Sequence, residues 1–265
     1  MSGIVSVAAV QMHSAIGEVI TNRQQAVEFV REAAANGAKL ISLPELWVTG
    51  YGLETGEFHR LSEPADGETV SLFKQLANEL KVVLIIPFPE KATKLGIENM
   101  FISAAIIDAD GTVVGIYRKS MLWGEESRTF VRGEKRYHVY ETAIGRIGVL
   151  ICYDIEFPEP TRLLALQGAD LLVVPSVWSK EAKSRWDIQL PARGLDNTIY
   201  VLGTNAVSGG ACGKSKFIGP QGTVLNEASS IEEEIIYGEV DLQTLLETRK
   251  TIPYLKDYKC QALVE

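Results

Sequence analysis

Short apolar runs rich in β-branched residues recur along the chain, and most of them are followed by a segment with helical spacing. The runs predict buried strands at 4–12, 38–46, 81–88, 145–154, 169–178 and 198–207. The spacing predicts helices at 22–36, 68–80, 159–167 and 186–196. Strands that alternate with helices are typical of an α/β core.

Two segments break this alternation. Residues 100–122 hold two extended runs joined by the turn sequence DADG at 108–111. Residues 215–229 predict a second hairpin, with a return strand at 233–241. A last helix at 242–248 leads into a tail that Pro253 breaks. With no repeats or linkers, the chain predicts one domain in which two mixed sheets pack face to face with helices outside both.

The composition excludes several classes of partner. The formal net charge is -8 and no block of Lys or Arg occurs, so the electrostatic pattern of a nucleic-acid or anionic-membrane binder is missing. Cys152, Cys212 and Cys260 lie far apart with no CxxC pair, which argues against a disulfide framework or a zinc knuckle. No signal peptide and no membrane span are predicted. A cytoplasmic protein with reduced thiols and a small-molecule partner is expected.

Other familiar kinds of site are not supported by the sequence. The stretch SGGACGKS ends like a phosphate-binding loop, but Ser208 stands where the first glycine is required and a strand-like segment follows it. His13, His59 and His138 have no partner at the spacing of a metal-binding helix, so no metal is expected. No GxSxG sequence is present, so an α/β-hydrolase serine nucleophile is not available.

Cys152 ends an apolar run at the point where polar residues take over. An unpaired cysteine in a buried strand is usually an inert space-filling residue. In open α/β folds, however, ligands bind at the carboxyl ends of strands, so a thiol at this place is positioned to react. A nucleophilic cysteine also needs a base or a cation beside it.

Glu45 and Lys119 stand at comparable places in the sequence. Glu45 follows the strand LISLP and Lys119 follows the strand VVGIYR, whereas His59 and His138 follow no predicted strand. Taken separately, Glu45 is explained as the cap of a turn and Lys119 as a solvated lysine on an edge strand. Together with Cys152, they predict a site in which a carboxylate, an ammonium group and a thiol meet at strand ends.

The segments around these residues resemble the nitrilase, or carbon-nitrogen hydrolase, superfamily, whose members use a Glu-Lys-Cys triad. The matching segments are LISLPELWVTGY, YRKSMLWGEE, GVLICYDIEFPE, LPARGLDNTIYVLGTNAV and SKFIGPQGTVL, in the family's order and over essentially the whole chain. The resemblance implies a four-layer α-β-β-α sandwich, a single domain over 1–265, and an amidase that needs no cofactor. It also implies a homodimer or higher homo-oligomer with a dimerisation tail at about 249–265.

The same resemblance implies roles for individual residues. Cys152 would be the nucleophile and Glu45 the general base. Lys119 and the backbone N–H of Tyr153 would face the developing oxyanion.

Many members of the superfamily carry a second glutamate shortly after the lysine. Two glutamates stand here, Glu125 and Glu126, and their spacing from Lys119 and from Gly133 favours Glu126. Its carboxylate would hydrogen-bond to Lys119 or to the substrate and fix its position.

The substrate class is partly indicated by the residues after the nucleophile. Members of the superfamily hydrolyse nitriles, amides, N-carbamoyl compounds or the side-chain amide of a 2-oxo acid, and Tyr153-Asp154 resembles the amidase branches. Branches that act on carboxylate-bearing substrates often carry arginine where this chain has Glu156. Glu156 therefore predicts a neutral or cationic amide. An equal alternative is that Glu156 caps the helix that begins near Pro158.

Tyr51, Trp123 and Trp178 are candidate walls of the substrate pocket, although aromatic residues are as often part of a core. Two functions of another class are also considered. One is a non-catalytic scaffold that keeps the fold, which the intact triad argues against. The other is a redox sensor in which Cys152 forms a disulfide with Cys212.

Overall fold

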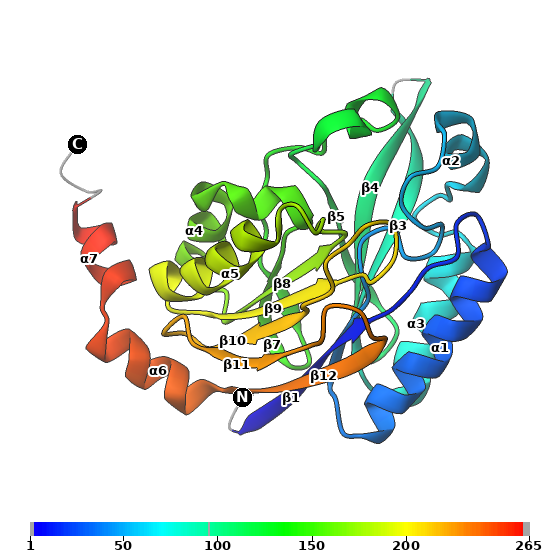
Figure 1. Ribbon diagram of the computed structural model, residues 1–265. Helices are drawn as coiled ribbons and strands as arrows, with labels where there is room; N and C mark the ends of the chain where they lie inside the picture. Colours follow the sequence, from blue (N-terminus) through cyan, green and yellow to red (C-terminus); the bar gives the residue numbers. More distant parts are fainter. Residues whose placement is uncertain (1–2, 95, 262–265) are drawn as a thin grey trace.

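The computed structural model describes residues 3–94 and 96–261. Their strands form two mixed sheets that pack face to face (Figure 1). The first sheet has the strand order β12-β1-β2-β3-β4-β5, with β1 Ile4–Gln11, β2 Leu40–Ser42, β3 Val83–Lys94, β4 Ile97–Ile107, β5 Val113–Arg118 and β12 Glu234–Asp241. The second has the order β11-β10-β9-β8-β7-β6, with β6 Tyr140–Thr142, β7 Gly145–Val149, β8 Leu171–Ser176, β9 Tyr200–Asn205, β10 Lys216–Ile218 and β11 Val224–Glu227.

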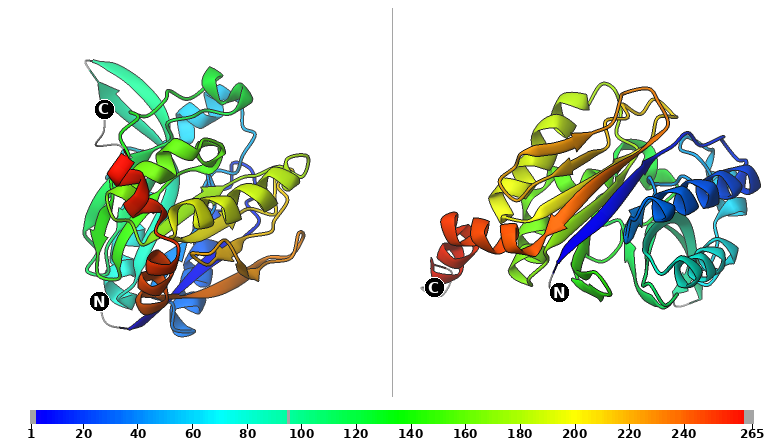
Figure 2. Two further views of the ribbon diagram at one scale, coloured as in Figure 1. Left: turned by 90° about the vertical axis from the view of Figure 1, so that its left-hand side faces the viewer. Right: turned by 90° about the horizontal axis from the view of Figure 1, so that it is seen from below.

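Helices cover the outer face of each sheet. The first sheet is covered by α1 (Val19–Ala35) and α3 (Glu68–Leu80), and the second by α4 (Pro158–Leu166) and α5 (Lys183–Asn197). Figure 2 shows α6 (Leu242–Thr251) and α7 (Tyr254–Gln261) projecting from the body near the C-terminus. The α-β-β-α sandwich expected from the sequence is confirmed.

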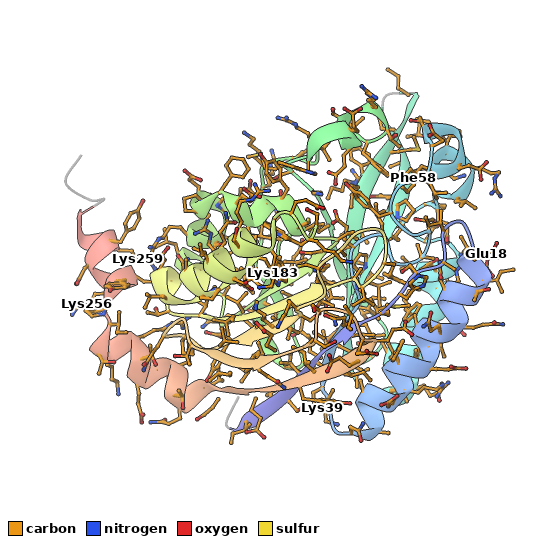
Figure 3. The ribbon with its side chains drawn as sticks, viewed as in Figure 1. Glu18, Lys39, Phe58, Lys183, Lys256 and Lys259 are labelled. Carbon is orange, nitrogen blue, oxygen red and sulfur yellow. The ribbon has the colours of Figure 1, made fainter. Side chains whose placement is uncertain are left out.

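The inner strands β2, β8 and β9 are buried along their whole length, and most of their residues are apolar. In β1, Val7 and Ala9 belong to the core between the sheets, while Ala8 and Val10 pack beneath α1 and α3. A strand buried on both sides appears in the sequence as a continuous apolar run. Such runs identified these segments. Figure 3 shows side chains filling the space between the sheets.

Three features of the fold differ from the sequence-based predictions. β3 and β4 form one long antiparallel hairpin from Leu84 opposite Ile107 to Lys94 opposite Ile97, so both strands are longer than predicted. The return strand β12 leaves the second sheet and pairs antiparallel with β1, because an alternating strand pattern does not specify its partner. Pro253 lies in the break between α6 and α7, as expected, but α7 was not predicted, and a proline is tolerated at a helix start.

The remaining differences are small. The short helix α2 (Thr55–Leu61) was not predicted, and α5 begins at Lys183 and contains Pro191. The tail expected at 249–265 is described to residue 261, and residues 262–265 lie outside the described part. None of the helices in the described ranges has the length and apolar character needed to cross a membrane.

Candidate active site

The site lies where the carboxyl ends of strands from both sheets meet. In the first sheet β2 and β3 are parallel, while β4 is antiparallel to both β3 and β5, so β2 and β5 run in the same direction. In the second sheet β7, β8 and β9 are parallel. Glu45 follows β2, Lys119 follows β5 directly and Cys152 follows β7, so the shared strand direction brings these three residues to one rim.

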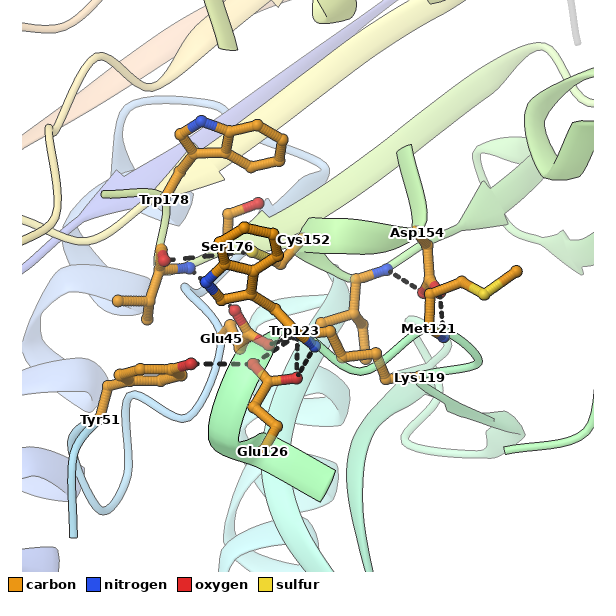
Figure 4. Close-up of polar contacts among 12 residues, drawn as sticks. Glu45, Tyr51, Lys119, Met121, Trp123, Glu126, Cys152, Asp154, Ser176 and Trp178 are labelled. Carbon is orange, nitrogen blue, oxygen red and sulfur yellow. Dashed lines mark hydrogen bonds and ion pairs between the residues drawn. The ribbon is translucent and has the colours of Figure 1, made fainter. Parts of the chain in front are cut away.

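Lys119 lies between two buried carboxylates (Figure 4). Its Nζ is 2.7 Å from Glu45 Oε1 and 2.8 Å from both carboxylate oxygens of Glu126. Glu45 and Lys119 are each 1% exposed and Glu126 is 7% exposed. Buried charges of this kind persist only when they are paired, so the three side chains hold one another in place.

Glu126 is fixed by contacts beyond the lysine. It lies in a 3₁₀ turn, Gly124–Arg128, and its carboxylate also accepts hydrogen bonds from the Tyr51 hydroxyl at 3.0 Å and the Trp123 backbone N–H at 2.9 Å. Glu125, by contrast, pairs with Arg128 at the surface. The structure therefore places Glu126, the preferred of the two, beside Lys119.

Cys152 has a left-handed backbone conformation, with φ of +47°, at the start of the 3₁₀ turn Cys152–Glu156. A non-glycine residue in this region is strained, and such strain concentrates at functional sites. β7 ends at Val149, before Cys152, so the thiol belongs to a sharp turn and not to the predicted strand. Its Sγ lies 4.0 Å from the carbonyl oxygen of Val177, the residue after β8.

Val177 also holds the carboxylate of Glu45. Its backbone N–H donates to Glu45 Oε2 at 2.9 Å, so a residue of the second sheet fixes a carboxylate of the first. Glu45 thus has one oxygen on Lys119 and the other on Val177.

The electrostatics of the cluster favour a protonated thiol at rest. Burial and the carboxylates of Glu45 and Glu126 raise the pKa of Cys152 well above its ordinary value, and Lys119 only partly opposes them. Burial also raises the pKa of Glu45. For Lys119, burial lowers the pKa, but the two carboxylates outweigh it and raise the pKa well above the usual value. Lys119 taken alone lowers the pKa of Cys152, but burial and the two carboxylates outweigh it.

Asp154 joins the turn Cys152–Glu156 to the segment that follows Lys119. Its Oδ1 accepts from the Ser120 N–H and hydroxyl and from the Met121 N–H, at 3.2, 2.9 and 2.8 Å. Its Oδ2 accepts from the Tyr117 hydroxyl at 2.7 Å and the Ile151 N–H at 3.0 Å. The carboxylate is fully buried, so it is a structural tie between β5 and β7.

A cavity of about 90 Å³ opens beside Cys152. All of the pocket residues predicted from the sequence line it, namely Tyr51, Trp123, Tyr153, Glu156 and Trp178. Trp178 is 3% exposed and Trp123 is 47% exposed, so one is part of the core and the other reaches the surface. Glu156 does not cap α4, whose N-cap is Phe157 without a side-chain hydrogen bond.

Comparisons with known proteins identify the family. Residues 6–250 match the family model described as carbon-nitrogen hydrolase. The chain belongs to the carbon-nitrogen hydrolase family. It is 33% identical to human omega-amidase NIT2 over 253 residues, which covers 89% of this chain and 88% of the relative.

Solved structures of the family superpose closely on this carbon-nitrogen hydrolase. Saccharomyces cerevisiae Nit3, a member of branch 10 of the nitrilase superfamily, has a TM-score of 0.88 at 30% identity, with 96% of each chain covered. An amidase from Nesterenkonia sp. AN1, solved as a mutant in complex with butyramide, has a TM-score of 0.77 at 26% identity, with 93% of this chain and 95% of the amidase covered.

Three residues that contact the site were not identified from the sequence, namely Val177, Asp154 and Arg185. Val177 acts through its backbone, which leaves no trace in residue type. Asp154 follows the nucleophile by two positions, and a carboxylate at the end of a buried strand was the available signal. Arg185 lines the cavity opposite Glu156, and nothing in local spacing connects these two residues.

Proposed function

We propose that this carbon-nitrogen hydrolase cleaves a small carboxylic amide to an acid and ammonia through a thioester on Cys152. The observation that carries the proposal is the buried network in which Glu45 lies between Lys119 and Val177, close enough to the thiol to raise its pKa. A nucleophile, a base and a cation are thereby gathered beside one cavity.

In the acylation step, Cys152 Sγ attacks the carbonyl carbon of the amide while Glu45 accepts the thiol proton. The C=O π pair moves to the oxygen, which faces the Lys119 ammonium and the backbone N–H of Tyr153. Loss of one such donor typically costs about a hundred- to a thousandfold in rate. When the carbonyl reforms, the C–N bond breaks and Glu45 returns the proton to the nitrogen, which leaves as ammonia.

Deacylation uses the same groups in the reverse order. Glu45 takes a proton from a water molecule, whose oxygen attacks the thioester carbon. Collapse of the second tetrahedral intermediate breaks the C–S bond, and the proton on Glu45 returns to Cys152. One carboxylate therefore serves both steps, which is consistent with its raised pKa.

Glu126 and Lys119 have supporting parts in this mechanism. Because Lys119 has carboxylates on two sides, it stays protonated and acts as a fixed cation. Glu126 holds the ammonium in place through hydrogen bonds to Nζ. A small displacement of a catalytic group is costly in rate, so Glu126 is a positioning residue in the first instance.

A neutral or cationic amide is the proposed substrate, since Glu156 faces the cavity and repels a carboxylate. The similar Nesterenkonia amidase was solved with butyramide, a neutral amide, which supports this proposal. The second candidate is the omega-amide of a 2-oxo acid. It is favoured by the similarity to human omega-amidase NIT2 and by the guanidinium of Arg185, which a substrate carboxylate can approach.

Ammonia release tests the proposal directly. The substrates are butyramide, butyronitrile, an N-carbamoyl amino acid and a 2-oxo-acid omega-amide, with wild type, Cys152→Ala and the matched control Cys212→Ala. Cys212 is a buried free thiol that accepts a hydrogen bond from Asn205, outside the cavity lining. Release from butyramide that disappears only in Cys152→Ala supports the amidase. Release from none of the compounds favours the scaffold function.

The two cysteines also allow the redox function to be tested. Cys152 and Cys212 are both free thiols in the structure, and the side chain of Cys260 lies outside the described part. A Cys152–Cys212 disulfide formed under mild peroxide would support the redox sensor. A thiol count that peroxide leaves unchanged argues against it.

We also propose a homodimer. Apolar side chains stand exposed on the outer helices, with Leu163 on α4, Ile188 and Leu195 on α5 and Tyr258 on α7. Light scattering after gel filtration distinguishes a dimer from a monomer, and Ile188→Glu is expected to shift the equilibrium toward the monomer.

A further inference from the structure

The cavity beside Cys152 contains an ion pair. Among the described residues that line it, Glu156 and Arg185 carry the charges. Glu156 comes from the end of the 3₁₀ turn that begins at Cys152, and Arg185 comes from the first turn of α5. The pair therefore joins the nucleophile turn to the helix that covers the second sheet.

The geometry of this pair leaves part of the guanidinium free. A single nitrogen, Arg185 Nη1, lies 2.8 Å from Glu156 Oε1 and 2.9 Å from Oε2. Within residues 3–94 and 96–261 the Nε and Nη2 groups of Arg185 have no hydrogen-bond partner. An arginine carries five N–H donors in a planar fork, so donors remain available beside the cavity.

The surroundings keep Arg185 in place without using those donors. Its guanidinium carbon lies 5.3 Å from the centroid of the Trp123 ring, and Trp123 packs edge-on against Tyr153 at 5.0 Å. Both aromatic rings line the cavity. The side chain of Arg185 is 40% exposed and that of Glu156 is 16% exposed, so the pair stands at the mouth of the cavity and is partly solvated.

We propose that the Glu156–Arg185 pair determines the charge of the acyl group that the enzyme accepts, and that it selects an uncharged one. This inference rests on the proposed amide hydrolysis and narrows it. A substrate carboxylate is attracted by Arg185 and repelled by Glu156, and a substrate ammonium group experiences the opposite pair of forces. For neither charged group does the attraction to the pair offset the free energy lost when the group gives up its water in a small cavity with aromatic walls.

An uncharged acyl group enters the same cavity at a lower cost in desolvation. An apolar chain of a few carbons loses little on entering the cavity and packs against the Trp123 and Tyr153 rings. A carbonyl or hydroxyl oxygen on that chain finds the free Arg185 donors, and a hydrogen bond to a charged donor is stronger than one between neutral groups. Cationic amides, which Glu156 alone would favour as substrates, are therefore excluded.

Three amides of matched length test this inference. They are valeramide, succinamate and γ-aminobutyramide, whose distal groups are neutral, negative and positive. The variants are Glu156→Gln, Arg185→Gln and the charge-swapped double variant Glu156→Arg with Arg185→Glu. The readouts are kcat/KM from ammonia release, with KM and kcat determined separately, and protection of Cys152 from alkylation by iodoacetamide.

Wild type is expected to prefer valeramide over both charged amides. Glu156→Gln should raise kcat/KM for succinamate relative to valeramide by about tenfold or more, because an unpaired guanidinium remains. Arg185→Gln should raise the relative kcat/KM for γ-aminobutyramide to a similar extent. The changes should lie in KM. The double variant should return to the wild-type ranking, which a loss of folding cannot imitate.

Two results would overturn the inference. One is a ranking of the three amides that is the same in wild type and in both single variants. The other is a double variant that keeps the preference of one of the single variants. If wild type releases no ammonia, the proposed function fails, while the protection of Cys152 by each amide still ranks binding and so still tests the pair.

Discussion

The carboxylate of Asp154 accepts hydrogen bonds from both the backbone N–H and the hydroxyl of Ser120, the residue that follows Lys119. Asp154 itself stands two residues after Cys152 in the same 3₁₀ turn. Cys152 and Lys119 follow strands of different sheets, so their separation depends on how well the two sheets are fixed to each other. This single buried carboxylate provides one such tie.

Asp154→Asn is expected to weaken that tie. An amide offers one acceptor oxygen where the carboxylate offers two, and its NH₂ group then faces buried donors. Stability should fall by about 2–4 kcal/mol, because buried donors are left unsatisfied. The kcat should fall by about ten- to a hundredfold as Lys119 shifts relative to Cys152. Urea unfolding and steady-state kinetics measure the two effects separately.

Tyr117→Phe is the matched control for Asp154, because it removes one donor to the same carboxylate at 2.7 Å. It is expected to cost about 1 kcal/mol of stability with a smaller effect on kcat. A folded Asp154→Asn variant with the wild-type kcat would show that the tie has no part in catalysis.

Glu45→Gln is expected to slow turnover strongly and to make the thiol more acidic. Burial raises the pKa of Cys152, and the Glu45 carboxylate raises it further, so removing that negative charge lowers it. The pH midpoint of Cys152 alkylation should therefore move down, while amide hydrolysis falls by about a hundred- to ten thousandfold. Glu125→Gln, which alters a surface ion pair, should change neither quantity. A midpoint that stays or rises in Glu45→Gln contradicts the assigned electrostatics.

Lys119→Met should destabilise the protein in a pH-dependent way. The substitution leaves Glu45 and Glu126 buried without a cation, which costs about 3–5 kcal/mol at neutral pH. In wild type the pKa of Lys119 is raised on folding, so its contribution is complete below the ordinary lysine pKa of about 10.4 and is lost as pH rises through the raised value. Burial raises the pKa of Glu45, so acidification of the variant protonates this unpaired carboxylate, and the loss of stability should shrink toward pH 5.

Urea unfolding of Lys119→Met at pH 5 and pH 7 measures this dependence. Addition of Glu126→Gln to the variant removes one of the two buried charges and should recover part of the stability at pH 7. A deficit of equal size at both pH values would indicate that lost packing, and not unpaired charge, is responsible.

Gly133→Ala is expected to displace the lysine segment. A Cβ at this position would lie 2.2 Å from the backbone oxygen of Arg118, and the Gly133 N–H donates to the carbonyl oxygen of Lys119 at 2.8 Å. The contact is with backbone, so the segment itself must move and kcat should fall. Gly56→Ala in α2 is the control, since open space surrounds that position and alanine favours a helix by about 0.5–1 kcal/mol. Equal kcat values for the two variants would refute the expectation.

The sequence was sufficient for the layers and for placing Glu45, Lys119 and Cys152 at one rim, because both depend on local patterns. The apolar runs of the inner strands are long enough to be recognised, and Glu45, Lys119 and Cys152 each follow one of them. Since parallel strands end at the same rim, their meeting follows from strand direction. No local pattern, however, shows which sheet a strand such as β12 joins.

The contacts that complete the site could not be predicted for the same reason. The N–H of Val177 acts on Glu45 from the opposite sheet, and its side chain has no part in that bond. Arg185 is one of several charged residues near the start of α5, and its role depends on a partner in another turn. Glu156 alone therefore suggested an acidic pocket, whereas the pair is close to neutral.

The pairing of β12 with β1 has a consequence for synthesis of the protein. Ile4 lies opposite Asp241 and Gln11 lies opposite Glu234, so this pairing has to wait until β12, which follows all the other described strands along the chain, has been synthesised. Until then the free side of β1 is an unprotected strand edge, which other chains can extend. Premature release of the nascent chain before β12 would thus yield an aggregation-prone fragment and not a smaller enzyme.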